Sequence, residues 1–566
     1  MNPLKTVRVA ALQMAAGTDV EANLSTALRL IDEAAGDRPD LMVLPEFVNH
    51  ASWYDDQEHC NRVAVRTDGD FLRQIAERAR RHSCFIVINV TLLREDDGIR
   101  CTGSSLLYDR RGDLLCVSDK QVLMGHENDF LQPARTVSPV IETEIGRIGL
   151  YSCMDGVVCE TSRSLAVRGA TILCNSLNSF AADEGRLHIP VRAAENKVFV
   201  VAANKVGALI PEEMLEGVGA AINIPPRFLY GAGDSQIVAP DGTVMVRAPV
   251  NGESIIMADL DLSRANEKHR PDGTHIMDSR RPEIYGPLLA ADEPAPESGP
   301  VAGDDEDPRL RVAAVQPAGS SRAELLALTR QALQNHDLVV LPERSGLPEQ
   351  DAAADAGLTT GLQELCGPEQ HVVTSMIMEE GGRAVHCAVL IGEQGVLHRQ
   401  PALHGSAAFP GMAPGADRIR LWPTPAGPLC LLTAADAIHP ESFRLAALAG
   451  AAMVLLPGRV QESWETSTGL PERAAENRLC VVAASPDDSS LVLDLPRDFT
   501  IMTPWQQRVF DGNISTPLIR QAAAGRAILS GRIHPRRAAN KVLSGSTNLI
   551  RSRARYPEGG LAGFND

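Results

Sequence analysis

The sequence predicts an α/β layered fold that occurs twice, in two tandem copies. Three segments recur in the same order along the 566 residues. The first copies are VRVAALQ (7–13), LMVLPE (41–46) and RAAENKVFVVAAN (192–204), and the second copies are LRVAAVQ (310–316), LVVLPE (338–343) and RAAENRLCVVAAS (473–485). Self-similarity over whole segments indicates duplication of a domain.

Within each copy, strands and helices alternate. VRVAALQ is followed by Leu24, Leu28 and Ile31 at helical spacing, and LMVLPE is a short apolar strand. A helix from about 161 to 168 leads into the apolar strand ATILCNS. Strands that are apolar throughout and separated by helices are typical of α/β folds with covered sheets.

The segment from Pro287 to Arg309 separates the two copies. It is rich in Pro, Gly and acidic residues and lacks apolar periodicity, which predicts an extended linker. We therefore expect a first domain over 1–288, a linker over 289–309 and a second domain over 310–566.

Composition excludes several classes of partner. The formal net charge is −18, and no Lys/Arg run offers a footprint for nucleic acid or anionic membranes. The N-terminus lacks the features of a secretory signal, and the longest apolar run is too short to span a bilayer. The 11 Cys show no CxxC spacing, so we expect a cytoplasmic protein without disulfides, metal or cofactor.

Three residues that follow predicted strands form a chemically complete set: Glu46, Lys120 and Cys153. A thiolate is a nucleophile strong enough to attack an amide, and a carboxylate in a dry pocket has a pKa high enough to take the thiol proton. A lysine ammonium stabilises the oxyanion that forms. The chain has only six Lys, with Arg used almost everywhere else, yet Lys stands at this position.

These segments resemble the nitrilase superfamily of carbon–nitrogen hydrolases. The family's nucleophile lies in a GxxGxxxxCxD context, which stands here as Gly146, Gly149, Cys153 and Asp155. The segments GAGDSQIVAPDG (231–242) and RRPEIY also match. The resemblance implies a four-layer αββα sandwich, two of which pair into an eight-layer dimer. A tethered second copy would then occupy the partner position as an intrachain pseudo-dimer, with further homo-oligomerisation open.

Four more residues are candidates for supporting roles. Glu127 corresponds to a second glutamate that many members of the family carry near the lysine. The backbone N–H of Met154 would be placed to stabilise the oxyanion. Loops after Glu46 and from Asn178 onward should line the pocket, so Tyr54 and Asn178 are candidates for recognition of the substrate, although each also reads as a plain loop residue.

The second copy lacks this chemistry. Glu343 is present, but Ala434 aligns with Cys153, at the same spacing that separates the two RAAEN segments. The segment GVLHRQPALHG, which aligns with the lysine segment, contains no Lys. We therefore expect a pseudo-enzyme domain.

The residues after the nucleophile favour one reaction. Nitrilases resemble one another in a CWE context, whereas Cys153-Met154-Asp155 is closer to the amidase and carbamoylase branches. We expect hydrolysis of a small amide or N-carbamoyl compound through a Cys acyl-enzyme, with release of ammonia. The alternatives are nitrile hydrolysis and a non-catalytic binding or scaffold protein.

Overall fold

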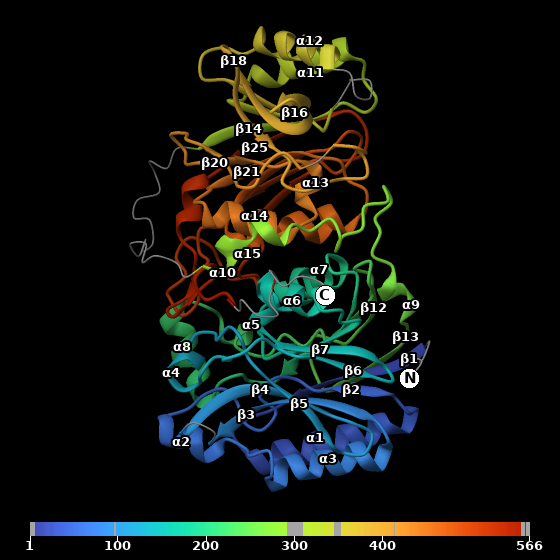
Figure 1. Cartoon of the computed structure of the whole chain (residues 1–566). Coiled ribbons are helices and arrows are strands. Elements are labelled where there is room, and N and C mark those ends of the chain that lie inside the picture. Colours follow the sequence, from blue (N-terminus) through green and yellow to red (C-terminus); the bar gives the residue numbers. More distant parts are fainter. Residues whose placement is uncertain are drawn as a thin grey trace. The chain divides into compact units, whose positions relative to one another are not determined.

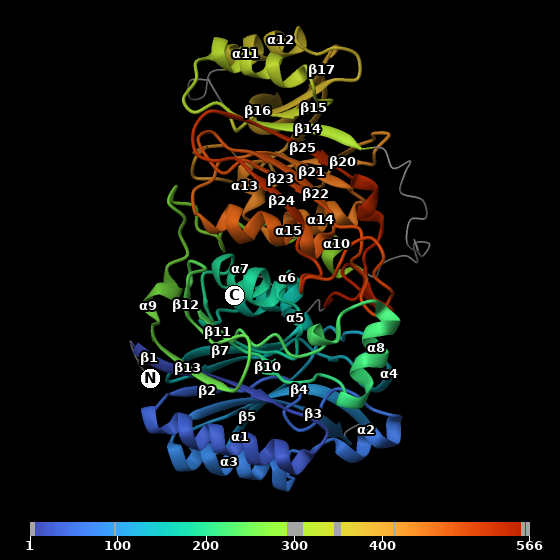
Figure 2. The same cartoon turned by 180° about the vertical axis from the view of Figure 1, so that it is seen from behind.

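The computed structural model describes residues 6–95, 98–290, 309–344, 352–412, 414–555 and 561. They form two compact units, shown in Figures 1 and 2. Unit 1 comprises Met1–Glu267, Asp498–Ile514 and Val542–Asp566, and unit 2 comprises Lys268–Arg497 and Ser515–Lys541.

The first sheet of unit 1 has the order β10-β1-β2-β3-β4-β5, with β13 also paired to β1. Its strands are β1 (Thr6–Ala15), β2 (Leu41–Val43), β3 (Phe85–Arg94), β4 (Arg100–Tyr108), β5 (Leu114–Asp119), β10 (Lys205–Val206) and β13 (Ser254–Asp261). Helices α1 (Val20–Ala34) and α3 (Asp70–His82) cover its outer face (Figure 1). Helix α1 begins at Asp19, whose carboxylate accepts hydrogen bonds from two backbone N–H groups of the first turn.

The second sheet has the order β12-β11-β9-β8-β7-β6. Its strands are β6 (Val140–Thr143), β7 (Gly146–Ser152), β8 (Ile172–Ser176), β9 (Phe199–Ala203), β11 (Gln236–Val238) and β12 (Val244–Arg247). Helices α6 (Cys159–Val167) and α7 (Ile189–Ala194) lie on its outer face (Figure 1). Residues such as Val9, Val43, Leu150, Cys174 and Val201 fill the space between the two sheets. Unit 1 is therefore an αββα sandwich, and the predicted α/β fold is confirmed.

Shorter elements connect these layers. They are α2 (Gln57–Val63), α4 (Glu127–Phe130), α5 (Met154–Val157), α8 (Leu215–Ile222), α9 (Ser263–Asn266) and the single turns η1 (Ala35–Asp37), η2 (Glu184–His188), η3 (Glu212–Met214) and η4 (Pro226–Phe228). A hairpin of β26 (Val542–Ser544) and β27 (Thr547–Asn548) also belongs to unit 1.

Unit 2 repeats the strand orders of unit 1, as β18-β17-β16-β15-β14-β25 and β19-β20-β21-β22-β23-β24, except that β10 has no counterpart among its described strands. The first sheet contains β14 (Leu310–Gln316), β15 (Leu338–Val340), β16 (His371–Glu380), β17 (Arg383–Gly392), β18 (Gly395–Pro401) and β25 (Ala527–Ile533). The second contains β19 (Leu421–Trp422), β20 (Leu429–Leu431), β21 (Met453–Pro457), β22 (Cys480–Ala484), β23 (Leu491–Asp494) and β24 (Leu518–Gln521). The helices and turns are α10 (Gly286–Leu289), α11 (Arg322–Leu333), α12 (Ala352–Gln363), α13 (Ala434–Ala437), α14 (Pro440–Leu448), α15 (Leu470–Asn477), η5 (Pro282–Ile284), η6 (Glu465–Gly469) and η7 (Pro535–Ala539).

The compact units cross the boundaries that the sequence predicts at 288 and 310. Residues from Lys268 onward already belong to unit 2, whereas two segments from the second half, Asp498–Ile514 and Val542–Asp566, belong to unit 1. The reason is packing, because apolar side chains of 498–514 and 542–549 join a cluster of unit 1. In unit 2, the hydroxyl of Tyr285 lies 2.9 Å from Nε2 of His404, and Arg280 pairs with Glu441. Most of the predicted linker, 291–308, lies outside the described residues.

The added segment 498–514 is integral to unit 1. Trp505 and Phe510 are 1% exposed and pack with Met154 in one apolar cluster. The N–H of Ala182 donates to the carbonyl of Gly512 at 2.7 Å, and the N–H of Ile514 donates to Oδ2 of Asp183 at 2.7 Å. This segment therefore orders the loop after β8.

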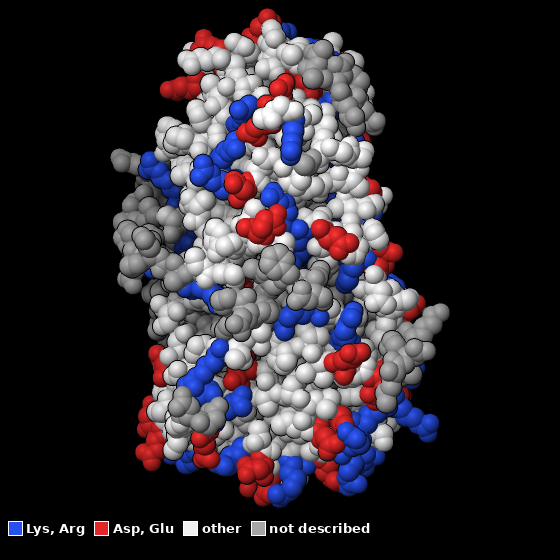
Figure 3. Space-filling model, viewed as in Figure 1, with Lys and Arg blue, Asp and Glu red and all other residues white. Residues whose placement is uncertain are grey.

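Charged side chains of both signs are interspersed on the face that Figure 3 shows. On α3, for example, Arg80 pairs with Glu77 at 2.7 Å. No helix within the described part of the chain is both long and apolar enough to cross a membrane.

Trp505→Ala should lower the free energy of unfolding by about 3–5 kcal/mol, because it empties a large buried site. Val509→Ala is the matched control, because Val509 is 82% exposed in the same segment and its truncation should cost less than about 0.5 kcal/mol. Urea unfolding followed by circular dichroism measures both. Equal effects would mean that the segment is not part of the core.

Candidate active site

Glu46 lies just beyond the end of β2 with its side chain fully buried. The N–H of Glu46 donates to the carbonyl of Leu177 at 3.1 Å, which joins this loop to the end of β8. The next residue, Phe47, has a positive φ of 52° and donates its N–H to Oδ1 of Asn89 at 3.0 Å. The backbone around the carboxylate is thus held from two sides.

Lys120 follows β5 and is also buried. Its Nζ lies 2.8 Å from Oε1 of Glu46 and 2.9 Å from Oε1 of Glu127. Glu127 begins α4, and its Oε2 accepts a hydrogen bond from the N–H of Met124 at 2.9 Å. One ammonium is therefore shared by two carboxylates, and the structure brings together three of the residues that the sequence singled out.

Cys153 lies at the sharp turn between β7 and α5. Its φ of 47° and ψ of −108° are unusual for a residue with a side chain and cost on the order of 1–3 kcal/mol. Hydrogen bonds hold this conformation, because the N–H of Cys153 donates to the carbonyl of Ser176 at 3.0 Å and to Oδ1 of Asn175 at 3.1 Å. A strained turn that presents a thiol is typical of a nucleophile.

Asp155 connects the cysteine turn to the lysine segment. Its Oδ1 accepts hydrogen bonds from the N–H groups of Gln121 at 3.0 Å and Val122 at 2.8 Å. Its Oδ2 accepts from the N–H of Ser152 at 3.3 Å. This carboxylate therefore ties the two residues after Lys120 to the residue before Cys153.

Burial and charge shift the pKa values of all three residues. Burial raises the pKa of Glu46 to about 7, although the nearby Lys120 opposes the rise. Burial, together with the charge of Glu46, raises the pKa of the Cys153 thiol well above its ordinary value, while Lys120 opposes this. Burial alone would lower the pKa of Lys120, but the carboxylates of Glu127 and Glu46 hold it above the ordinary value. The lysine is therefore charged, and Glu46 is suited to exchange a proton near neutral pH.

Lys205 is a further charged residue that the sequence reasoning missed. It lies on β10, is fully buried, and its Nζ has no hydrogen-bond partner among the described residues. Burial lowers its pKa to about 7, while the charges of Glu46 and Cys153 oppose this shift. A signal was present in the sequence, because Lys205 is one of only six Lys and directly follows an apolar strand.

The remaining predicted residues have different surroundings. The hydroxyl of Tyr54 lies 2.6 Å from Oγ1 of Thr91, and its ring stacks on His50, so its polar group already has a partner. Met154 begins α5, so its N–H is not used by the helix, while its side chain packs in the apolar cluster with Trp505. Asn178 is half-buried, and its Oδ1 has no hydrogen-bond partner among the described residues.

Unit 2 has the same backbone frame with other side chains. Oδ1 of Asp436 accepts hydrogen bonds from the N–H groups of Leu403 and His404, both at 2.9 Å, as Asp155 does in unit 1. By this correspondence Ala402 stands where Lys120 stands, and Ala434 where Cys153 stands. Thr433 caps α13 with an ordinary φ of −89°, so the strained turn is absent here.

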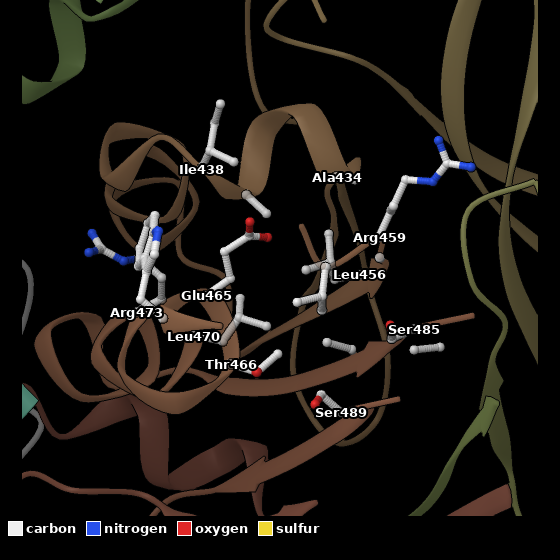
Figure 4. Close-up of a pocket in the computed structure, with 17 residues that line it drawn as sticks. Ala434, Ile438, Leu456, Arg459, Glu465, Thr466, Leu470, Arg473, Ser485 and Ser489 are labelled. Atoms are coloured by element: carbon white, nitrogen blue, oxygen red, sulfur yellow. The ribbon is translucent and has the colours of Figure 1, made fainter. Parts of the chain in front are cut away.

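Rings occupy the space that the lysine and its partner occupy in unit 1. His386 and Phe409 have ring centroids 4.2 Å apart, and Nε2 of His386 lies 3.8 Å from Oε1 of Glu343. Burial lowers the pKa of His386 to about 4 and raises that of Glu343 to about 7, so both are neutral between about pH 4 and pH 7. A pocket beside Ala434 remains, and Figure 4 shows the carboxylate of Glu465 pointing into it.

Metal binding is not indicated by the geometry of the described residues. No group of three or more His, Cys, Asp or Glu side chains among them is arranged to hold a metal ion.

Comparison with known proteins gives matches that cover about half of the chain. A nitrilase from Pyrococcus abyssi is 28% identical over 281 residues, which cover 49% of this chain and 99% of that protein. An N-carbamoylputrescine amidase from Arabidopsis thaliana is 24% identical over 300 residues, covering 50% of this chain and 96% of that protein. Among solved structures, an amidase from Nesterenkonia sp. is 22% identical with a TM-score of 0.38 and covers 46% of this chain and 92% of its own.

The family model described as carbon–nitrogen hydrolase matches residues 8–270, which contain Glu46, Lys120 and Cys153. Residues 8–270 are therefore a segment that matches the carbon–nitrogen hydrolase family, and the match covers just under half of the 566 residues.

Proposed function

We propose that the protein hydrolyses a small amide or N-carbamoyl compound through a thioester on Cys153 and releases ammonia. The observation that carries this proposal is the buried arrangement of Glu46, Lys120 and Cys153 at the ends of three strands, with the lysine 2.8 Å from the glutamate. The set supplies a base, a cation and a nucleophile.

Glu46 is the general base of the first step. Its pKa of about 7 lets the ionised carboxylate accept the proton of the Cys153 thiol at neutral pH. The thiolate then attacks the substrate carbonyl carbon, and the carbonyl electron pair moves to oxygen. Lys120 and the N–H of Met154 stabilise this oxyanion, a contribution of about 3–4 kcal/mol for each well-placed donor.

Collapse of the intermediate breaks the C–N bond and leaves an acyl group on sulfur. The proton held by Glu46 passes to the leaving nitrogen, which departs as ammonia. Glu46 then takes a proton from water, and the hydroxide attacks the thioester carbon. The C–S bond breaks, the acid product leaves, and the Cys153 thiolate takes the proton back from Glu46. Glu127 keeps Lys120 charged and in place through both steps, because its carboxylate lies 2.9 Å from Nζ.

Two other functions remain in competition. The same nucleophile would attack a nitrile, and the residues Cys153-Met154-Asp155 are what favour an amide or carbamoyl substrate. A non-catalytic binding or scaffold protein would not need a strained Cys153 beside a buried ion pair. An ammonia-release screen over amides, ureido acids and nitriles separates the three.

We further propose that unit 2 is a degenerate copy that arose by duplication. The matching order of the other strands and the corresponding hydrogen bonds of Asp155 and Asp436 support a common origin. With Ala402 and Ala434 in place of cation and nucleophile, it is a pseudo-enzyme that serves as an intrachain partner of unit 1. The cysteines are free thiols, which suits a cytoplasmic location.

Cys153→Ala should abolish ammonia release while the fold is retained, because no other group can form the thioester. Intact mass spectrometry of the wild type with substrate should show an acyl adduct that Cys153→Ala lacks. Cys116→Ala, which removes a half-buried thiol on β5, should keep the activity. Substantial turnover by Cys153→Ala would refute the assignment.

Glu46→Gln should lower kcat by at least 100-fold, because the amide cannot take the thiol proton. Glu343→Gln is the matched control in unit 2 and should leave kcat nearly unchanged. Steady-state kinetics on both variants tests this. A similar loss in both would show that unit 2 takes part in the reaction.

The pH dependence of kcat/KM should follow Glu46. The base works only when ionised, so kcat/KM should rise with pH through a limb near 7. The charge of Lys205 lowers the pKa of Glu46, so Lys205→Met should move the limb to higher pH. Lys268→Met, in unit 2, should leave the limb in place. An unchanged limb in Lys205→Met would mean that the limb reports another group.

A further inference from the structure

One segment from each half of the chain belongs to the compact unit that is formed mainly by the other half. After β13 the chain enters unit 2 at Lys268, and after β25 it enters unit 1 at Val542. The two segments are related in sequence, as KHRPDGTHIMDSR (268–280) and KVLSGSTNLIRSR (541–553). Each carries a threonine at the same position, Thr274 in the first and Thr547 in the second.

Thr547 holds the loop that follows Lys120. Its Oγ1 donates to the carbonyl of Leu123 at 2.9 Å and accepts from the N–H of Gly125 at 3.2 Å. The N–H of Gly125 also donates to Oγ of Ser544 at 3.1 Å. Thr547 is 1% exposed and Ser544 fully buried, so water does not replace these bonds.

This loop leads directly to the carboxylate that holds the lysine. Met124 lies between Leu123 and Gly125, and its N–H donates to Oε2 of Glu127 at 2.9 Å. Glu127 in turn lies 2.9 Å from Nζ of Lys120. A displacement of the loop would therefore displace Glu127 and with it the ammonium.

Thr274 makes the corresponding contact in unit 2, where no reaction is expected. Its Oγ1 accepts a hydrogen bond from the N–H of Ala407 at 3.1 Å. The loop there leads to Phe409 in place of Glu127, and Ala402 stands where Lys120 stands. The same hydrogen bond from a loop N–H to a threonine hydroxyl thus occurs twice in the chain. In unit 1 the loop leads to Glu127, which pairs with Lys120, and in unit 2 it leads to Phe409.

We propose that Thr547, supported by Ser544, is a positioning residue for the Glu127–Lys120 pair, so that the second half of the chain completes the active site of the first. The inference rests on the proposed function of unit 1. It assigns a role to the retained second copy, which supplies the hairpin β26–β27 to the catalytic loop. Thr547 touches neither substrate nor reacting atoms, and it acts through the loop.

Thr547→Val in the full chain is the principal test, because valine keeps the shape and removes the hydroxyl. We expect kcat to fall roughly tenfold to 100-fold with little change in KM, since small misplacements of a charged group cost this much. Thr547→Ser keeps the hydroxyl and should restore most of kcat. Thr274→Val, the matched control, should have wild-type kinetics.

Three outcomes would overturn the inference: wild-type kcat in Thr547→Val, equal losses in Thr547→Val and Thr547→Ser, or an equal loss in Thr274→Val. If Thr547→Val does not fold, Ser544→Ala removes the other acceptor of Gly125 and should lower kcat to a smaller extent, and unchanged kcat would again overturn it. Failure of the proposed function is distinguishable, because the wild type itself would then release no ammonia and form no acyl adduct on Cys153.

Discussion

The structure of unit 1 depends on placing two carboxylates and one ammonium in a dry interior. Glu46 and Glu127 share Lys120, so the ammonium cannot fully compensate both. Transfer of a charge from water to such a site costs several kcal/mol. The part of this cost that Lys120 does not offset favours the neutral form of Glu46 and so raises its pKa. A base poised near neutrality is thus the direct result of burial. Every strand end around it must then be held firmly, because Coulombic terms at this distance change steeply with position.

Unit 2 shows the same backbone arrangement without the buried lysine and the cysteine. Without a lysine, the space is filled by the rings of His386 and Phe409. Without a cysteine, the strained turn becomes an ordinary helix start capped by Thr433. The hydrogen bonds of Asp436 to the neighbouring loop remain. The hydrogen bonds of Asp155 and Asp436 occur in both units and hold the backbone, whereas Lys120 and Cys153 have Ala402 and Ala434 as their counterparts in unit 2.

Local patterns in the sequence predicted the strands, the αββα class by resemblance, and the three residues Glu46, Lys120 and Cys153 that the structure brings together. Less local features were missed. The assignment of 268–290 to unit 2 and of 542–555 to unit 1 leaves no periodic pattern in the sequence, whereas the Pro-rich stretch between the copies predicts a boundary there. Lys205 was overlooked because lysine usually lies on the surface. Recognition of the substrate by Tyr54 stays a prediction, and its hydroxyl lies 2.6 Å from Oγ1 of Thr91, a partner 37 residues away that local sequence does not reveal.

The hairpin β26–β27 belongs to unit 1 but lies near the end of the chain, so its contacts with unit 1 form late in synthesis. Gly125 and its partner Thr547 are 422 residues apart in the chain. At about 5–20 residues per second, a ribosome needs on the order of 20–80 s to make the intervening chain. When the first sandwich emerges from the ribosome, the hydrogen bonds of Leu123 and Gly125 to this hairpin have therefore not yet formed. These contacts complete unit 1 only when the polypeptide is nearly finished, and a prematurely terminated product lacks them altogether.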